Sequence, residues 1–459
     1  MRIFCFHTIL CIGLLAPLTA PAQPTVSLTP LVSLHGSYGN CPQATLLQAQ
    51  DGNLYGTTID GGGGGGLLFK VTPDGVLTVL HSFNYYTEGG GPFAPLVQRA
   101  DGNIYGVARV GGPPSPRNWG GTIFQMSTNG IFTNLFFFPD YADAPNSPLG
   151  YNPIALFLSS DGNFYGTTDG GILPTTSGSV FKMTPDGVIS VLWTFSGLEA
   201  HRVYSLVETG DGYLYGTAAV GSTSCGCTNG TIFRIGRNPG SPIQIVNFGD
   251  TGGTNGSGPE FLMLAADGNF YGRATYGGAF GAGTIFKLTP DGTLSTIHAF
   301  SGLEGHPTGL MQATDGNFYG TTYEGTIFRL APAGQFTVLH TFSAIDVCGK
   351  NPYGLVQGRD GSFYGTTCAG TTNGGGAVYR MTVASADAPW IQSVTPSTGG
   401  TILKWLALKG RVYQVQSCSD LRGNWTDVGL PVTATSQSAT ASDEGGSEGR
   451  RFYRVALLP

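Results

Sequence analysis

The sequence predicts an all-β fold made of seven copies of one four-stranded unit. Three observations support this prediction. The motif Asp-Gly-(Asn/Tyr/Ser)-x-Tyr-Gly recurs at intervals of 45 to 60 residues, each copy leads into aromatic and β-branched residues, and tight-turn sequences separate the apolar runs. Self-similarity at such a period is typical of propellers and solenoids. The seven copies begin at Asp51, Asp101, Asp161, Asp211, Asp267, Asp315 and Asp360.

The strands of one unit can be placed in order. A short apolar run such as residues 354–357 precedes Asp-Gly, and Phe-Tyr-Gly-Thr-Thr follows it, so these two runs are predicted to form a hairpin. A third strand such as residues 283–288 (GTIFKL) leads into Thr-Pro-Asp-Gly, where Pro presets φ and Gly accepts a positive φ. A fourth strand such as residues 293–300 completes the unit. The Tyr of each Tyr-Gly is expected to pack between units, with Gly allowing a close approach.

Four antiparallel strands per unit favour a seven-bladed β-propeller, in which radial repetition leaves only short sheet edges. Residues 31–36 (LVSLHG) have the character of a fourth, outer strand, but no first three strands precede them. The seventh unit ends at residues 376–381 (GAVYRM) without a fourth strand. We therefore expect the N-terminal strand to complete the last blade and close the ring.

The chain is predicted to have four parts. Residues 1–22 have the pattern of a secretory signal peptide, with Arg2, an apolar run and a small-residue end at Ala20-Pro21-Ala22. The propeller is expected over residues 23–382, a linker over 383–389, and a small β-sandwich-like module over 390–459, in which polar and apolar residues alternate. Since no second long apolar run occurs, no transmembrane segment is expected. The sequence thus predicts a secreted protein, extracellular or at the cell surface.

Composition restricts the class of partner. Only 11% of the residues are charged, and removal of Arg2 with the signal leaves 21 basic against 28 acidic residues, a net charge of −7. Without a basic stripe to neutralise phosphates, nucleic acid is not an expected partner. We expect an extracellular glycan or protein as the partner, and a monomeric chain.

The cysteines suggest one disulfide rather than a disulfide scaffold. Two of the eight cysteines leave with the signal, and the others enter an oxidising space. We expect Cys348, in the connection into blade seven, to pair with Cys368, in the loop after that blade's second strand, because both loops share a face. The competing pair is Cys41 with Cys368. Cys225 and Cys227 are too close in sequence for an unstrained bridge, and no nearby His suggests a zinc site.

The repeats resemble a known family. DGNFYGTT, GTIFKLTPDG and TLSTIHAFSG are similar to the Gloeobacter/Verrucomicrobia-type extracellular repeat, also called the GloVer tandem repeat, over roughly residues 31–381. This resemblance implies a secreted, propeller-like bacterial protein and no particular reaction. The tail, with YQVQSCSDL and RFYRV, resembles a small C-terminal domain of secreted proteins from the same kind of bacteria. Relatives often end in a sorting signal, for which residues 456–459 are too short.

The two faces of the predicted ring differ. The Asp-Gly turns are uniform, whereas the loops after the second strands and the connections between blades vary in length, and rigid scaffolds carry function on such loops. Long insertions in blades one to three provide aromatic planes and a planar cation, which suit sugar rings or protein interfaces. The alternative is that they only cover the ends of the blades. The candidate binding residues there are Tyr85, Tyr86, Arg117, Trp119 and Tyr141.

Two histidines are added to the candidate binding residues. His201 and His306 each follow a Glu-x-His pattern just before the innermost strand of blades four and six, which places them near the mouth of the central channel. Other blades carry Cys, Gly or Asn at about this point, so a His cluster does not form. We therefore predict no metal site and no cofactor. The Asp-Gly-Asn repeats are likewise explained by tight turns rather than by calcium loops.

Two classes of function fit the sequence. The first is a secreted, non-catalytic propeller that binds a glycan or protein through its variable loop face. The second is an extracellular polysaccharide hydrolase or lyase that uses paired carboxylates near the channel mouth. Its candidate carboxylates are Asp140, Asp143, Glu199 and Glu304. No nucleophile elbow, phosphate loop or dinucleotide motif is present, and no catalytic residue is assigned.

Overall fold

The structure is a computed structural model of the 459-residue chain. It describes residues 25–113, 120–140, 147–169, 178–195, 201–220, 229–248, 253–343, 346, 348–369, 374–384, 391–397, 400–407, 411–418, 425–435, 438–443 and 451–457. Two compact units are formed, one by residues 26–382 and one by residues 383–459 together with residues 1–25. The predicted signal peptide and most of the predicted linker lie outside the described residues.

Within the described residues, the first unit consists of seven four-stranded antiparallel sheets, which we number in chain order. The strands of sheets one to three are β2 (Leu47–Gln48), β3 (Leu54–Thr58), β4 (Leu67–Val71), β5 (Leu77–Ser82), β6 (Val97–Gln98), β7 (Ile104–Ala108), β8 (Thr122–Met126), β9 (Phe132–Phe137), β10 (Pro153–Leu158), β11 (Phe164–Thr168), β12 (Ser179–Met183) and β13 (Ile189–Thr194). Those of sheets four and five are β14 (His201–Glu208), β15 (Leu214–Val220), β16 (Thr231–Ile235), β17 (Ile243–Asn247), β18 (Ser257–Leu264), β19 (Phe270–Tyr276), β20 (Thr284–Leu288) and β21 (Leu294–Ala299). Those of sheets six and seven are β22 (Pro307–Gln312), β23 (Phe318–Thr322), β24 (Thr326–Leu330), β25 (Phe336–Thr341), β26 (Lys350–Gln357), β27 (Phe363–Ala369), β28 (Ala377–Ala384) and β1 (Thr25–Ser33).

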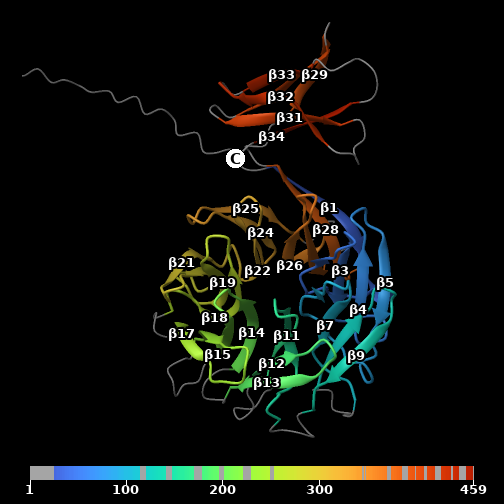
Figure 1. Ribbon diagram of the computed structural model, residues 1–459, viewed down its shortest axis with the longest axis vertical. Helices are drawn as coiled ribbons and strands as arrows, with labels where there is room; N and C mark the ends of the chain where they lie inside the picture. Colours follow the sequence, from blue (N-terminus) through green and yellow to red (C-terminus); the bar gives the residue numbers. More distant parts are fainter. Residues whose placement is uncertain are drawn as a thin grey trace, which may run out of the picture. The chain divides into compact units, whose positions relative to one another are not determined.

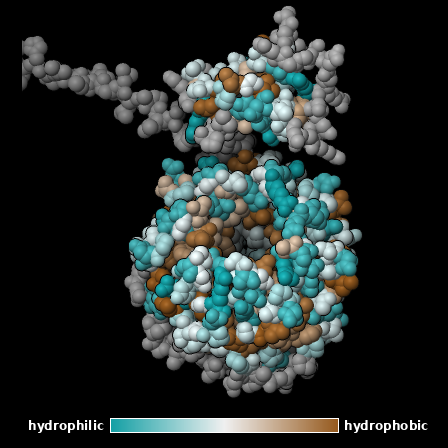
Figure 2. Space-filling view, viewed as in Figure 1, coloured by the Kyte–Doolittle hydropathy of each residue, from teal (hydrophilic) through white to brown (hydrophobic). Residues whose placement is uncertain are grey.

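The sheets stand side by side in a ring, which gives the unit a β-propeller fold (Figure 1). The first strand of each sheet lies toward the centre, where β10 contacts β14, β14 contacts β18 and β22 contacts β26. The fourth strands, such as β5, β13 and β21, lie at the periphery. Figure 2 shows the ring hollowed at its centre. The residues of the first strands therefore face a central channel.

The ring closes through pairing between the two ends of the unit. β1 takes the outer position of sheet seven, in the order β1-β28-β27-β26. Beyond this strand, the backbone N–H of Leu34 donates to Gly376 O over 2.9 Å, and that of Cys41 donates to Gly375 O over 2.9 Å. A short 3₁₀ turn, η1 (Gly36–Tyr38), leads from β1 toward sheet one. The first strand of the chain is thus held by the last sheet of the ring.

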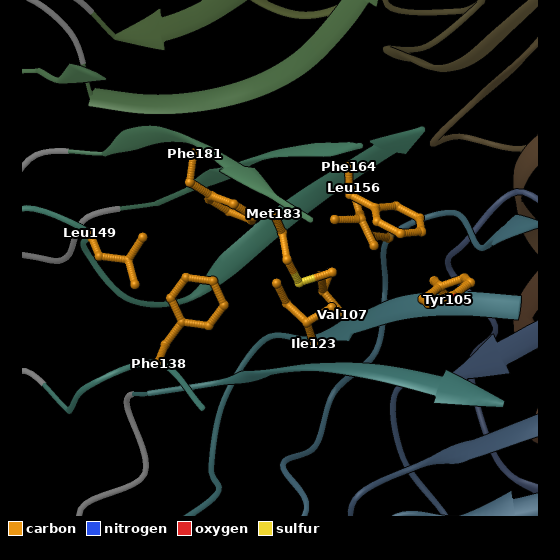
Figure 3. Close-up of a cluster of buried hydrophobic side chains, with 10 residues drawn as sticks. Tyr105, Val107, Ile123, Phe138, Leu149, Leu156, Phe164, Phe181 and Met183 are labelled. Atoms are coloured by element: carbon orange, nitrogen blue, oxygen red, sulfur yellow. The ribbon is translucent and has the colours of Figure 1, made fainter. Parts of the chain in front are cut away.

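Neighbouring sheets pack through an aromatic contact that the repeated motif supplies. Tyr105 of sheet two packs on Phe164 of sheet three with ring centroids 4.5 Å apart, and the same contact recurs between sheets four and five, five and six, and six and seven. Figure 3 shows Tyr105 and Phe164 in the buried cluster between sheets two and three, together with Ile123 and Met183. Burying such rings is the main source of stability at these junctions.

The Asp-Gly-x-x-Tyr-Gly motif makes both the turn and the junction. Asp315 accepts the backbone N–H of Asn317 with one carboxylate oxygen (3.0 Å) and the hydroxyl of Tyr319 with the other (2.9 Å). The same Tyr–Asp bond occurs in five other sheets. A methyl group at Gly320 would collide with the ring of Phe328, so glycine is required there. The carboxylates therefore form hydrogen bonds within their own turns, in agreement with the tight-turn explanation of the Asp-Gly-Asn repeats.

On the side of the Asp-Gly turns, side-chain hydrogen bonds link neighbouring sheets. At five of the seven junctions an amide or carboxylate oxygen at the end of a first strand accepts a backbone N–H from the preceding sheet, over 2.7 to 2.9 Å. One of these bonds, from Arg359 N to Gln48, crosses from sheet seven to sheet one. The acceptors are Gln48, Gln98, Glu208, Gln312 and Gln357.

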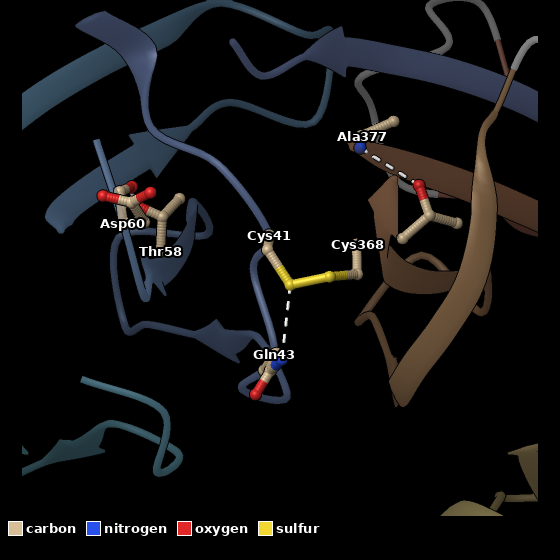
Figure 4. Close-up of a disulfide and its surroundings, with 7 residues drawn as sticks. Cys41, Gln43, Thr58, Asp60, Cys368 and Ala377 are labelled. Carbon is tan, nitrogen blue, oxygen red and sulfur yellow. Dashed lines mark hydrogen bonds between the residues drawn. A yellow bond between two sulfur atoms is a disulfide. The ribbon is translucent and has the colours of Figure 1, made fainter. Parts of the chain in front are cut away.

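The expected Cys348–Cys368 disulfide is wrong. Cys368 at the end of β27 is bonded to Cys41 in the connection from β1 to β2, which was the competing pair (Figure 4). The bond therefore spans the closure of the ring, not the connection into sheet seven. Cys348 is instead a buried free thiol, and burial together with the nearby Asp346 raises its pKa to about 11. Burial raises the pKa of the Tyr379 hydroxyl, and the nearby Cys348 thiol raises it further.

The second unit contains two three-stranded antiparallel sheets in its described residues. The core between them includes Trp405 and Tyr413, whose ring centroids are 6.1 Å apart. One sheet has the order β29 (Ile391–Ser397), β30 (Gly400–Leu406), β33 (Ser438–Asp443), and the other β32 (Thr426–Thr433), β31 (Val412–Cys418), β34 (Phe452–Leu457).

In the part of the chain that the structure describes, no helix has the length and apolar character needed to cross a bilayer.

Candidate functional site

The face opposite the Asp-Gly turns carries the variable loops, and we call it the variable face. Each first strand begins on this face, and each second strand ends there. In six sheets the residue directly before the Pro or Val near the start of the first strand has a left-handed backbone, with φ between 52° and 65°. Asparagine and glycine tolerate this conformation, whereas bulkier residues are strained in it. The residues in this position are Cys41, Gly91, Asn152, Arg202, Gly258 and Asn351.

Arg202, rather than His201, is the counterpart of His306. Val203 pairs with Ala218 in sheet four as Pro307 pairs with Thr322 in sheet six, which aligns the residues that precede them. The two Glu-x-His patterns predict equivalent histidines, but sheet four is offset by one residue. His201 begins β14. The strained position in sheet four is thus occupied by an arginine.

Arg202 and Arg109 share one buried carboxylate. Asp169 follows β11 in sheet three, and only 9% of its side chain is exposed. Its Oδ2 accepts a hydrogen bond from Nη2 of Arg109 in sheet two over 2.8 Å, and its Oδ1 lies 3.5 Å from Nε of Arg202 in sheet four. The two arginine side chains are 43% and 55% exposed. A single carboxylate therefore holds guanidinium groups from two sheets that are not neighbours.

The charged network continues around the channel. Tyr204, two residues after Arg202, raises the pKa of that guanidinium, and Asp169 adds to the effect. Burial raises the pKa of the Tyr204 hydroxyl, and Glu260 of sheet five raises it further. Glu260 in turn accepts a hydrogen bond from Nη1 of Arg273 over 2.8 Å. The network thus extends from sheet two to sheet five.

Arg273 extends the network toward sheets six and seven. Burial raises the pKa of Tyr353 in sheet seven, as does Tyr323 of sheet six, while Arg273 of sheet five lowers it. Arg273 also donates to the carbonyl oxygen of Pro307 in sheet six over 3.1 Å. We call Arg109, Asp169, Arg202, Tyr204, Glu260 and Arg273 the mouth cluster.

His306 lies in a second group on the same face. Its Nδ1 is 2.7 Å from Oε1 of Glu324, and its backbone N–H donates to Oε2 of the same residue over 2.6 Å. Its ring meets that of Tyr276 in sheet five edge-on, with centroids 6.2 Å apart. Tyr323, next to Glu324, is more than half exposed, as is Tyr276. His306 thus contributes to an exposed aromatic surface rather than to a pair with a second histidine.

The other candidate binding residues are distributed as follows. Tyr86 is largely exposed in the connection between sheets one and two, and its ring meets that of half-buried Tyr85 at 5.7 Å. Both tyrosines lie on the variable face, as expected. The side chain of His201 and the whole of Arg117, Trp119 and Tyr141 lie outside the described residues.

The described candidate carboxylates are engaged in local structure. Asp140 is 1% exposed. Glu304 accepts the backbone N–H of Ser301 over 2.8 Å and lies 3.5 Å from Nε2 of His298. Asp143 and Glu199 lie outside the described residues. Within the residues that are described, no three His, Cys, Asp or Glu side chains form a group that could hold a metal ion.

Sequence reasoning missed the mouth cluster because its members do not share a motif. Two signals were nevertheless present. Arg109 and Asp169 directly follow the second strands of sheets two and three, where other units carry Ile59, Tyr323 or Cys368. Glu260 and Tyr204 each directly follow the Pro or Val that comes after the left-handed position. A charged residue at the channel end of a repeat is detectable once the units are aligned.

Comparison with known proteins supports the family resemblance and the fold. The sequence profile described as the Gloeobacter/Verrucomicrobia repeat matches residues 18–151 and 152–348. No curated protein matches the chain by sequence.

Among solved structures, oligogalacturonate lyase in complex with manganese has a TM-score of 0.53 at 10% identity, covering 80% of this chain and 98% of that one. PorZ, a surface component of the type IX secretion system of Porphyromonas gingivalis, has a TM-score of 0.51 at 13% identity, covering 93% of this chain and 58% of PorZ. At these identities the similarity concerns the fold alone.

Proposed function

The chain belongs to the Gloeobacter/Verrucomicrobia repeat family, and from this premise we propose that it is a secreted, seven-bladed propeller that binds an extracellular glycan without catalysing a reaction. The seven sheets are its blades, and the variable face is its binding surface. The protein acts as a monomer, and the second unit is an accessory module.

Exposed aromatic rings on the variable face carry this proposal. Tyr86, Tyr276, Phe280 and Tyr323 are each more than half exposed, and all four lie in loops or strand ends on that face. A flat ring with few rotatable bonds stacks on a sugar with little loss of entropy. On the opposite face, the exposed apolar residues of the turns are the aliphatic Val76, Ile131 and Val188.

The disulfide supports an extracellular location. Cys41–Cys368 joins residues 327 positions apart across the closure of the ring. Such bonds persist in oxidising compartments and are rare in reducing ones. Together with the signal-peptide pattern of residues 1–22, this favours export.

A binding role fits the described acidic residues better than catalysis does. Glycosidases need two carboxyl groups facing one bond at a defined separation. Asp140 is buried, Glu304 caps its own turn, and Asp169 and Glu260 are each paired with arginine. The polysaccharide hydrolase or lyase alternative therefore depends on Asp143 and Glu199, and a cleavage assay addresses it directly.

A glycan array with residues 23–459 tests the proposal. Once a glycan is found, Tyr276→Ala and Tyr86→Ala should each weaken binding by about 1–3 kcal/mol, because each removes an exposed stacking ring. Ile131→Ala, an exposed apolar residue in a turn on the opposite face, is the matched control and should leave affinity unchanged.

Three results would contradict the proposal. Shortening of the glycan during incubation would show an enzyme. Binding to a protein ligand but to no glycan would show a different partner class. Loss of binding on Trp425→Ala, with both tyrosine variants unaffected, would move the site to the second unit, where Trp425 lies 4.5 Å from the Arg454 guanidinium.

A further inference from the structure

We propose that the mouth cluster recognises a carboxylate-bearing sugar, a uronate, and that Arg109 and Arg202 bind its carboxylate. This inference rests on the proposed glycan-binding function and names the class of glycan. It depends on three observations. The backbone of Arg202 is left-handed, Asp169 contacts both arginines, and the side chains of these two arginines are more exposed than that of Arg273.

The backbone of Arg202 is strained in a way that the fold does not require. Its φ of 55° is that of Asn152 and Asn351 in the same position of sheets three and seven. A residue other than glycine or asparagine is strained in this region, and such outliers concentrate at functional sites. The other such residue in this position, Cys41, forms the disulfide. Asparagine would form the same turn without this penalty. The arginine therefore supplies something that the turn itself does not need, namely its guanidinium.

Asp169 positions both guanidinium groups in advance. A carboxylate that is buried, and that contacts Arg109 at 2.8 Å and Arg202 at 3.5 Å, limits the freedom of two long side chains. Fixing such side chains before binding reduces the entropy lost when the ligand arrives.

The exposure of the arginines separates ligand-binding groups from structural ones. The side chain of Arg273 is 16% exposed, and its Nη1 is engaged by Glu260 and the carbonyl of Pro307. Those of Arg109 and Arg202 are 43% and 55% exposed. A guanidinium that faces solvent presents a planar pair of donors, which matches the geometry of a carboxylate. Arg273 supports the channel wall, while Arg109 and Arg202 face the ligand.

Aromatic surfaces beside the two arginines suit the ring of a sugar. The Arg109 guanidinium lies over the ring of Phe93, 5.4 Å from its centroid, and Tyr204 lies beside Arg202. Phe93 and Tyr204 are both partly exposed. A carboxylate-binding pair next to aromatic faces selects a sugar acid over an isolated small anion, because the pyranose ring contributes apolar contact.

The test compares one polysaccharide with and without its carboxylates. Binding of residues 23–459 to oligomers of polygalacturonate is measured by calorimetry beside the same oligomers after chemical reduction of the carboxyl groups. Hydrogen bonds to charged groups contribute roughly 1.5–3 kcal/mol, so reduction should weaken binding about tenfold or more. Arg109→Ala should cause a similar loss. Arg99→Ala is the matched control, since Arg99 forms an exposed pair with Asp101 at 3.2 Å on the opposite face.

Arg202→Asn separates binding from folding. Asparagine relieves the left-handed backbone, so the variant should unfold at a denaturant concentration equal to or above that of the parent, while its affinity for the uronate oligomer falls about tenfold or more. An Arg202→Asn protein that keeps the parent affinity would overturn the inference.

Other outcomes distinguish this inference from the proposed function. Equal binding to native and reduced oligomers would overturn the uronate assignment while leaving glycan binding intact. Binding only to a sulfated glycan that lacks uronate, such as κ-carrageenan, would also overturn it. Failure of every glycan, with a protein ligand found instead, would overturn both.

Discussion

Replacing Cys41 and Cys368 together by serine should lower the free energy of unfolding of the propeller by about 3–6 kcal/mol. The disulfide closes a loop between residues 327 positions apart. In the chain-entropy model, a cross-link of this length restricts the unfolded chain by about 6 kcal/mol, and measured effects are commonly smaller. The native ring retains the pairing of β1 with β28 after the change, so the loss arises mainly in the unfolded state.

Chemical unfolding of residues 23–459 with and without reductant measures this effect. Reductant should lower the midpoint of the parent protein to that of the double serine variant, and should not alter the variant further. Cys348→Ala is the control, because its thiol is buried and free. That variant should lose some packing energy but keep its response to reductant. Identical midpoints for parent and double variant, or peptide mapping that finds Cys368 bonded to Cys348, would refute the reasoning.

Four further predictions concern stability. Gly320→Ala should lower the unfolding free energy by about 3 kcal/mol because the new methyl collides with Phe328, whereas Gly316→Ala, at φ +81° with nothing nearby, should lower it by about 1 kcal/mol. Removing residues 23–37 deletes β1 and should lower the unfolding midpoint by exposing the edge of β28; an unchanged midpoint would argue against ring closure by this strand. Burial raises the pKa of Asp161, but hydrogen bonds to its carboxylate outweigh this effect and lower the pKa to about 2. The stabilisation by this carboxylate is therefore complete above pH 3.8 and is lost as the pH falls toward 2. Asp161→Asn should make the unfolding free energy less dependent on pH in this acidic range. Burial lowers the pKa of His298, so stability should decline as pH falls below 6.5, and His298→Phe should reduce that decline.

The repeat made the fold predictable. Period, turn residues and β-branched runs act locally, within some fifty residues, so one sequence unit specifies one sheet and its turns. The Asp-Gly motif illustrates this, since Asp315, Asn317 and Tyr319 form their hydrogen bonds within five residues of one another. The family resemblance was confirmed because it rests on the same local residues.

The site was less predictable because it is assembled from different units. The patterns around His201 and His306 suggested equivalent histidines, yet a one-residue offset placed Arg202 in the strained position instead. Which residue occupies this position depends on how the first and second strands pair, and the spacing of Glu and His does not determine that pairing. The same limit applies to the disulfide, because choosing between Cys41 and Cys348 as the partner of Cys368 requires knowing which loops meet at the closure.

The sequence by itself determined the unit, its number of copies, and the position of the tight turns, since those depend on φ preferences and on alternation along a short stretch of chain. Only the tertiary structure decided that Arg109, Asp169 and Arg202, from three different sheets, meet at one point of the channel. They meet because the sheets are arranged in a ring and because the second strands of sheets two and three end on the same face as the start of the first strand of sheet four. A contact between residues about thirty to sixty positions apart, none of which share a motif, leaves no periodic signal in the sequence.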